Sequence, residues 1–223
     1  MPATRLLASA AIGCSLLAIS ACATNSAMPP PMAPLPPADF IALGVTAPYL
    51  SSAVIGGERS RAAKLRAAKV RPLGAAEVPA YMADLDGELR RQTAGIGLDV
   101  LRVGDGIVVR IPAALTFDAA SAAVKPQFEA TLLEISRTVK TRSRTYVDVY
   151  AHTDTSGTPQ VNQALSDRRA AAVAGYLATH GVAKARIASH GLGETAPLYI
   201  PDDTPTKQAG NRRVEIRLTP FRS

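Results

Sequence analysis

The distribution of apolar and polar residues predicts an α/β (α+β) domain over residues 98–223. Five short runs rich in β-branched and apolar residues have the pattern of strands; they are 98–103, 107–111, 146–151, 186–190 and 213–218. Two longer segments carry apolar residues at helical spacing; they are 125–141, with Pro126 in its first turn, and 166–180, with Gly181 as its stop. Strands that alternate with helices predict a mixed sheet covered by helices on one face.

Two further helices are expected before this domain. Tyr81, Leu85 and Leu89 repeat at i, i+4 and i+8, which predicts an amphipathic helix over 79–93. A short helix over 58–71 would carry six basic residues among alanines: Arg59, Arg61, Lys64, Arg66, Lys69 and Arg71. A solvated helix face is the default interpretation of these charges. The alternative is a patch that attracts an anionic polymer or lipid head groups.

The N-terminus has the pattern of an export signal. Arg5 precedes an apolar run from Leu6 to Ile19, which is shorter than the roughly 20 residues that span a bilayer. The run ends at Ile19-Ser20-Ala21-Cys22, which resembles a lipobox, the recognition sequence of bacterial lipoprotein signal peptidase. We therefore expect Cys22 to become an acylated N-terminus. The next residue is Ala23 rather than Asp, which resembles lipoproteins sorted to the outer membrane rather than the inner membrane. A plain secretory signal with a coincidental Cys is the alternative.

These patterns divide the chain into four segments. They are a signal peptide (1–21), a Pro-rich tether from the lipidated Cys22 (22–39), a helical linker region (40–97) and the α/β domain (98–223). The tether has no charged residue between Ala23 and Pro37 and should be extended, at about 3.1 Å per residue. The domain would thus hang from the outer membrane into the periplasm.

Charge and composition exclude several classes of protein. Basic residues outnumber acidic ones by 25 to 18, but the chain has no Trp and only 4% aromatic residues. Sites that read single-stranded nucleic acid need aromatic platforms beside a basic groove, so no nucleic-acid partner is expected. Two cysteines, Cys14 and Cys22, cannot form a disulfide framework or a zinc site of four thiolates. No metal and no cofactor are expected.

Four separate blocks of sequence resemble the OmpA-like C-terminal domain family. They are Leu115-Thr116-Phe117-Asp118, the run Ala151-His152-Thr153-Asp154 to Arg168-Arg169-Ala170, Gly191-Leu192-Gly193-Glu194, and Asn211-Arg212-Arg213-Val214-Glu215-Ile216. The resemblance covers about residues 99–220, with Ala151 where members of the family usually carry Gly. It implies the OmpA-like βαβαββ sandwich. It also implies peptidoglycan binding, the property of this family in Gram-negative envelopes.

Asp154 and Arg169 are the candidate binding pair. Asp154 leaves a strand end, and Arg169 lies in the first turns of the helix that follows a 155–164 loop, so both side chains can reach the same rim. A carboxylate accepts hydrogen bonds from a ligand ammonium, and a guanidinium can hold a ligand carboxylate with two parallel hydrogen bonds. A structural salt bridge between the two residues is the alternative.

The resemblance implies that the ligand is meso-diaminopimelate of the peptidoglycan stem peptide, whose free end carries an ammonium and a carboxylate on one carbon. Asn162 and Thr153 would add neutral hydrogen bonds, and Phe117 with Asp118 would form part of the opposite wall. Arg168 is expected to point elsewhere, into solvent or the domain. Arg212 and Arg213 are expected to stabilise the start of the last strand, although the resemblance also implies a basic residue near the site at this point.

Two other functions remain open at this stage. His152, Asp154 and His190 could be metal ligands or acid/base groups, but no nucleophile motif or HExxH spacing accompanies them, so no enzyme is expected. The lipobox, tether and domain together are also similar to Tol-Pal type lipoproteins, which implies the Tol system or other envelope proteins as possible partners. The region 40–97 is longer than those lipoproteins usually carry, which favours a different lipoprotein of the same family.

Overall fold

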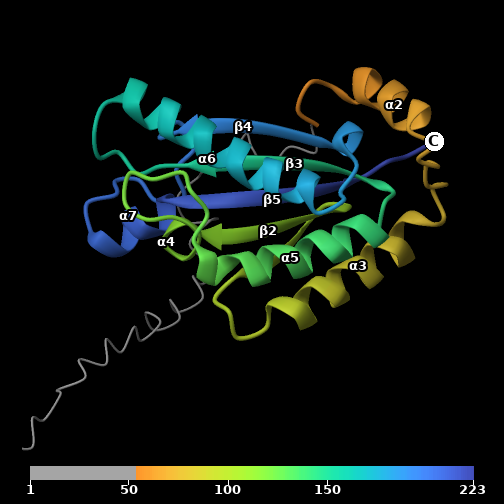
Figure 1. The fold of residues 1–223 in the computed structure, drawn as a ribbon, viewed down its shortest axis with the longest axis horizontal. Coiled ribbons are helices and arrows are strands. Elements are labelled where there is room, and N and C mark those ends of the chain that lie inside the picture. The colour runs from red at the N-terminus through yellow and green to blue at the C-terminus, as the bar shows by residue number, and fades with distance from the viewer. Residues whose placement is uncertain (1–53) are drawn as a thin grey trace, which may run out of the picture. The chain divides into compact units, whose positions relative to one another are not determined.

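The computed structural model describes residues 54–223, and a five-stranded sheet lies at the centre of this part of the chain (Figure 1). The strands are β1 (Asp99–Val103), β2 (Gly106–Pro112), β3 (Thr145–His152), β4 (Ile187–Gly193) and β5 (Arg213–Pro220). Their order in the sheet is β1-β2-β5-β3-β4. β3 and β4 pair in parallel and all other neighbours pair antiparallel, so the sheet is mixed, as predicted.

Long helices cover one face of this sheet. The helical segments are α2 (Glu58–Ala67), α3 (Val78–Thr93), α4 (Ala113–Thr116), α5 (Pro126–Thr141), α6 (Pro159–Thr179), the 3-10 turn η2 (Lys184–Arg186) and α7 (Pro205–Asn211). In Figure 1, α5 and α6 cross in front of the sheet and α3 lies beside α5. Alternate strand residues such as Val109, Val149 and Ile216 are fully buried against these helices, because successive strand side chains point to opposite faces.

The strands and helices α3 and α5 lie where the sequence predicts them, but α6 does not. It begins at Pro159, seven residues before the predicted Ser166, so the segment 155–164 is only partly a loop. Thr158 caps the helix by accepting a hydrogen bond from the Val161 backbone nitrogen at 3.3 Å. The first buried positions of the helix are polar, Asn162 and Ser166, so a search for apolar periodicity does not find these turns. α4 and α7 are short and were not predicted.

The second face of the sheet is polar and buried. Asp148 of β3 is fully buried and pairs with Arg61 of α2, and it also accepts a hydrogen bond from the Ile55 backbone nitrogen at 3.1 Å. Arg213 of β5 donates to Glu215 at 2.8 Å. The interpretation of 58–71 as a solvated face is therefore wrong for Arg61, because the buried carboxylate of Asp148 needs a cation beside it.

The helical segment before residue 98 is packed onto the sheet. Leu73, Met82, Leu85 and Leu89 belong to the same hydrophobic core as the strands. The boundary between 97 and 98 stays a prediction, and the core joins residues from both sides of it. The signal peptide, Cys22, the tether and the start of the linker region lie outside the described residues. Within 54–223, none of the helices combines the length and the apolar character needed to cross a bilayer.

Candidate functional site

A cavity of about 580 Å³ opens where β3 ends, between the start of α6 and the turn that follows α4. All six residues that the sequence predicted for binding line it: Phe117, Asp118, Thr153, Asp154, Asn162 and Arg169. They come from three separate parts of the chain, and the fold brings them together. Lys125 and Arg212 also line the cavity.

Asp154 is held by a partner that the sequence did not predict. Its side chain is only 7% exposed, and its Oδ2 forms an ion pair with Arg212. Its Oδ1 accepts a hydrogen bond from the Ser156 backbone nitrogen at 3.1 Å. No ion pair joins Asp154 to Arg169 among the described residues, so the structural salt bridge considered between these two is wrong.

Arg169 is fixed from the opposite side. Its Nε donates to the Ser121 carbonyl at 2.8 Å, its Nη2 donates to the Asp118 carbonyl at 3.3 Å, and its guanidinium lies 5.1 Å from the centre of the Phe117 ring. Burial lowers the pKa of Arg169, and the positive charge of Arg212 lowers it further. An anion in this cavity would relieve that repulsion, so the arrangement favours a ligand carboxylate.

The two neutral polar residues of the site, Asn162 and Thr153, hold the chain around Asp154 in place. Asn162 lies on α6, not in a loop, and its Nδ2 donates to the Asp154 carbonyl at 3.2 Å and to Glu194 Oε2 at 2.6 Å. The Thr153 backbone nitrogen donates to the Gly193 carbonyl at 2.8 Å. Their contacts set the position of Asp154.

The opposite wall consists of a buried ring and an exposed carboxylate. Phe117 is 2% exposed and lies under Arg169. The side chain of Asp118 is 79% exposed, and its Oδ1 lies 3.2 Å from Lys125 Nζ. Phe117 therefore shapes the cavity, whereas Asp118 contributes mainly through the carbonyl that Arg169 contacts.

Arg212 lines the cavity, although the sequence assigned it first to the last strand. It was expected to stabilise the last strand together with Arg213, but the two neighbours diverge. Arg213 is 1% exposed and donates to Glu215 and to the Ala196 carbonyl, whereas Arg212 turns to Asp154. Adjacent residues at a strand start point to opposite sides, so the doublet indicates that Arg212 and Arg213 have different surroundings. Arg168 is exposed, as expected.

Asn211, immediately before Arg212, anchors the loop between β4 and α7. Its Oδ1 accepts hydrogen bonds from the Leu198 and Tyr199 backbone nitrogens at 2.7 and 2.9 Å. Its Nδ2 donates to Asp202, which also accepts from Thr155 in the loop after Asp154. Desolvation would raise the pKa of Asp202, but these hydrogen bonds outweigh it and lower the pKa. The network ties the start of β5 to the end of β3.

Ser166 and Asp167, two turns into α6, are positioned by glycines of β4. Gly191 donates its backbone N–H to Asp167 at 2.9 Å, and Gly193 donates to Ser166 at 2.9 Å. A Cβ at Gly191 would overlap the Asp167 backbone nitrogen and the Ser166 hydroxyl. Only glycine permits this approach of helix to strand, and Arg169 follows one turn later on the same helix.

The histidines of the sequence do not meet at the site. His152 is 1% exposed, and burial lowers its pKa to about 3. His190 is exposed on β4. Among residues 54–223, no group of three or more His, Cys, Asp or Glu side chains is arranged to hold a metal ion.

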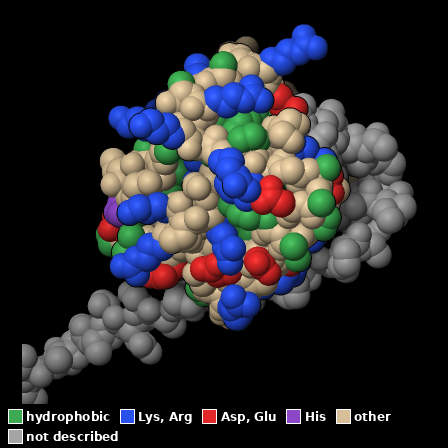
Figure 2. Space-filling view, turned by 90° about the vertical axis from the view of Figure 1, so that its right-hand side faces the viewer, with side chains coloured by type: hydrophobic (Ala, Val, Ile, Leu, Met, Phe, Trp, Pro, Cys, Tyr) green, Lys and Arg blue, Asp and Glu red, His purple; other side chains and the backbone are tan. Residues whose placement is uncertain are grey.

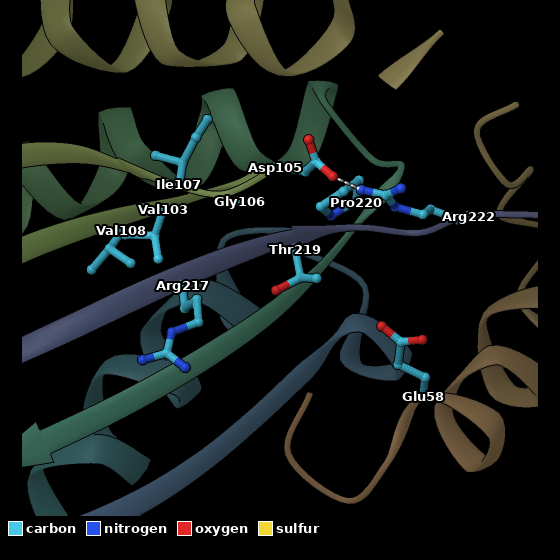
Figure 3. A pocket seen from close by; sticks show the side chains of 10 residues that line it. All are labelled: Glu58, Val103, Asp105, Gly106, Ile107, Val108, Arg217, Thr219, Pro220 and Arg222. Atoms are coloured by element: carbon cyan, nitrogen blue, oxygen red, sulfur yellow. Dashed lines mark hydrogen bonds and ion pairs between the residues drawn. The ribbon is translucent and has the colours of Figure 1, made fainter. Parts of the chain in front are cut away.

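A second cavity, of about 360 Å³, lies near the opposite end of the sheet (Figure 3). Asp105, Gly106, Thr219 and Arg222 line it together with Glu58 at the start of α2. Asp105 and Arg222 form an ion pair at its edge. None of the six predicted binding residues lines this cavity.

The comparisons with known proteins agree with this fold. A model described as "OmpA family" matches residues 116–212, which contain all six residues of the site. The chain is 36% identical over 218 residues to "Probable lipoprotein YiaD" of Escherichia coli (strain K12), covering 95% of this chain and 96% of that protein. This protein belongs to the OmpA family.

Two further relatives match parts of the chain. The chain is 44% identical over 70 residues to "Peptidoglycan-binding protein ArfA" of Mycobacterium tuberculosis, which is 31% of this chain and 21% of ArfA. Among solved structures, "the cell wall anchor of the T6SS from Pseudomonas aeruginosa" is similar with a TM-score of 0.53 and 31% identity, over 59% of this chain and 96% of that one. No catalytic family is indicated.

Proposed function

We propose that this protein binds peptidoglycan non-covalently through the diaminopimelate of the stem peptide and links the outer membrane to the cell wall. Membership of the OmpA family supports wall binding, as do the names of two relatives, a peptidoglycan-binding protein and a cell wall anchor. The lipobox at Cys22 and the lipoprotein relative support the membrane anchor.

The observation that carries the proposal is the separation of Asp154 from Arg169 within one cavity. Each charge is held by contacts with other groups, so the two do not neutralise each other. A ligand with an ammonium and a carboxylate on one carbon complements both. The guanidinium of Arg169 would hold the ligand carboxylate, and a free lone pair of Asp154 would accept from the ligand ammonium.

The expected affinity of a single site is modest. Charge-assisted hydrogen bonds contribute about 1.5 to 3 kcal/mol each, so the two contacts supply roughly 3 to 6 kcal/mol, which corresponds to about millimolar binding. Peptidoglycan is a repetitive polymer, and a lipid anchor would confine the protein beside it. The resulting effective concentration makes weak single-site binding sufficient.

Sedimentation with isolated sacculi tests the binding site. We expect Asp154→Asn and Arg169→Gln to lose most of the sedimenting fraction, and the matched control Arg168→Gln, which removes an exposed neighbouring charge on the same helix, to keep it. Undiminished sedimentation of both site variants would refute the assignment. The same samples check for catalysis, because a binder releases no soluble muropeptides.

The anchor has its own test. We expect radiolabelled palmitate to be incorporated into the wild type and not into Cys22→Ser, and the wild type to fractionate with outer membranes. Label in Cys22→Ser, or a wild type in the soluble periplasmic fraction, would contradict the lipoprotein assignment without affecting the wall site.

A further inference from the structure

One surface of the molecule is basic and takes no part in the wall site. Arg59, Lys64, Arg66 and Lys69, here called the α2 basic face, are exposed on α2 and the turn that follows it. Within residues 54–223, no ion pair joins any of these four to an acidic side chain, although Arg66 also lies over the Phe221 ring at 5.7 Å. Only one acidic residue, Glu58, occurs in the segment 58–71.

The α2 basic face is mounted rigidly. Arg61 on the inner side of the helix pairs with the buried Asp148 and also donates to the Arg186 carbonyl. Leu65 is fully buried against Tyr146 and Phe221. The inner side of α2 thus holds the helix on the sheet, and the four charges are displayed together on a fixed support rather than on a flexible segment.

This face lies at the end of the sheet opposite the wall site. Tyr146, which contacts α2, lies near the start of β3, and Asp154 lies eight residues further along, which is about 26 Å in an extended strand. Figure 2 views the end that carries α2 and the C-terminus: Lys and Arg side chains are spread over it, with Asp and Glu side chains mostly in its lower half. The cavity of Figure 3 opens at this end, beside Glu58.

Several other charges at this end already have partners. Glu77 accepts from Arg144 at 2.8 Å and lies 3.2 Å from Arg71, and Asp105 pairs with Arg222. With these pairs formed, the α2 basic face carries four positive charges that join no ion pair among residues 54–223, and Glu58 is the acidic residue beside them. The described part of the chain also begins at this end, since Val54 packs with Leu65.

We propose that the α2 basic face docks on an anionic phospholipid surface and thereby directs the wall site away from the membrane. Four clustered basic residues complement lipid phosphates. Val54, the first described residue, packs at the end of the domain that carries them. Binding at this face does not depend on the peptidoglycan site, because the two lie at opposite ends of β3.

Vesicle flotation tests the surface with the full chain carrying Cys22→Ser, which removes any acyl group. The comparison is between neutral phosphatidylcholine vesicles and vesicles with about 30% phosphatidylglycerol, at low and high salt. Every variant carries the same N-terminal segment, so whatever that segment contributes is common to all of them. We expect a clear preference for anionic vesicles that disappears at high salt.

The variant Arg59→Gln, Lys64→Gln, Lys69→Gln should lower this preference between about tenfold and a hundredfold, since each basic residue near an anionic surface contributes roughly a factor of five. Arg66 is kept because of its contact with Phe221. The matched control is Arg90→Gln, Arg91→Gln, Arg168→Gln, which removes the same charge from exposed positions outside the face. It should retain most of the preference.

Three results would overturn the proposal: equal partition of the wild type into both vesicles, an α2 variant that partitions as the wild type does, or a control that loses as much. Sacculus sedimentation of the α2 variant separates the lipid from the wall polymer. It should be unchanged, whereas a loss there without a loss on vesicles would assign the face to peptidoglycan instead. If Asp154→Asn sedimented with sacculi as the wild type does, this would contradict the proposed wall site and leave the lipid-binding proposal unaffected.

Discussion

The carboxylate of Asp154 contacts the guanidinium of Arg212, not that of Arg169, although Arg169 lines the same cavity. Arg169 is instead held by the Ser121 and Asp118 carbonyls. The cavity is therefore lined by two acidic and three basic side chains, an excess of one positive charge before any ligand binds: Asp118, Asp154, Lys125, Arg169 and Arg212. This excess suits a ligand that brings more than one carboxylate, as a peptide terminus with an amino acid side chain does.

Arg212→Gln should lower the stability of the protein more than its binding to sacculi. Removing the partner leaves Asp154 buried without a cation, which we expect to lower the free energy of unfolding by about 1 to 2 kcal/mol, since Arg212 itself is 40% exposed. Sacculus binding should fall less than tenfold, because Asp154 and Arg169 both remain. Chemical denaturation and sedimentation of the same preparation measure the two quantities.

Comparison with Asp154→Asn gives the control for this prediction. That substitution should remove most binding while costing little more stability than Arg212→Gln, because the amide is still able to accept from the Ser156 backbone nitrogen. A larger loss of binding in Arg212→Gln than in Asp154→Asn would make Arg212 the principal contact and would contradict the assignment.

Gly191→Ala should destabilise the protein by about 3 kcal/mol or more, because a Cβ there would overlap the backbone of α6 at Asp167. Gly175→Ala on the same helix is the matched control. Nothing lies within 4 Å of a Cβ at Gly175, so that substitution should stabilise the helix by roughly 0.5 to 1 kcal/mol. Thermal unfolding distinguishes the two, and a tolerated Gly191→Ala would be inconsistent with the close packing of α6 on β4.

The free energy of unfolding should fall over two successive pH ranges as the solution is acidified. Burial lowers the pKa of His152 from 6.5 to about 3, and the neighbouring Arg213 adds to this shift. Desolvation would raise the pKa of Glu215, but Arg213 outweighs it and lowers the pKa from 4.5 to about 2. In both cases the unfolded chain binds the proton more readily, so stability is complete above the unfolded pKa and is lost as the pH falls.

The first loss should begin near pH 6.5 from His152, and Glu215 should add to it below pH 4.5. Each pKa unit corresponds to about 1.4 kcal/mol, so the total reaches several kcal/mol. Denaturant midpoints at a series of pH values measure this. His152→Gln should flatten the curve between pH 6.5 and 4.5, while His190→Gln, at an exposed position, should not; an unchanged curve for His152→Gln would contradict the assignment.

Arg61→Leu should detach α2 from the sheet. It leaves Asp148 buried without its cation, and breaking such a pair from one side costs about 3 to 5 kcal/mol. Burial raises the pKa of Asp148 and Arg61 acts against this, so loss of Arg61 should raise that pKa further. Limited proteolysis should then cut near α2 first, whereas Arg59→Leu on the exposed side should leave the cleavage pattern as in the wild type.

Local sequence was sufficient for the strands and for α3 and α5. Their patterns depend on contacts within a single element or on motifs that follow one another closely along the chain. The lengths of strand, loop and helix placed Asp154 and Arg169 at one rim, the OmpA resemblance added the other four residues, and the fold brings all six to one cavity. The start of α6 was hidden because its first buried positions, Asn162 and Ser166, are polar and its first turn is defined by the Thr158 cap.

The partner of Asp154, the burial of Arg61 and the direction of each residue in Arg212-Arg213 depend on the tertiary structure. Asp154 and Arg212 are 58 residues apart, and Arg61 and Asp148 are 87 apart. No local pattern relates such positions, because a charged side chain looks the same in sequence whether it meets water or a buried counter-charge. The position of β5 between β2 and β3 brings Arg212 to Asp154. The packing of α2 against β3 brings Arg61 to Asp148.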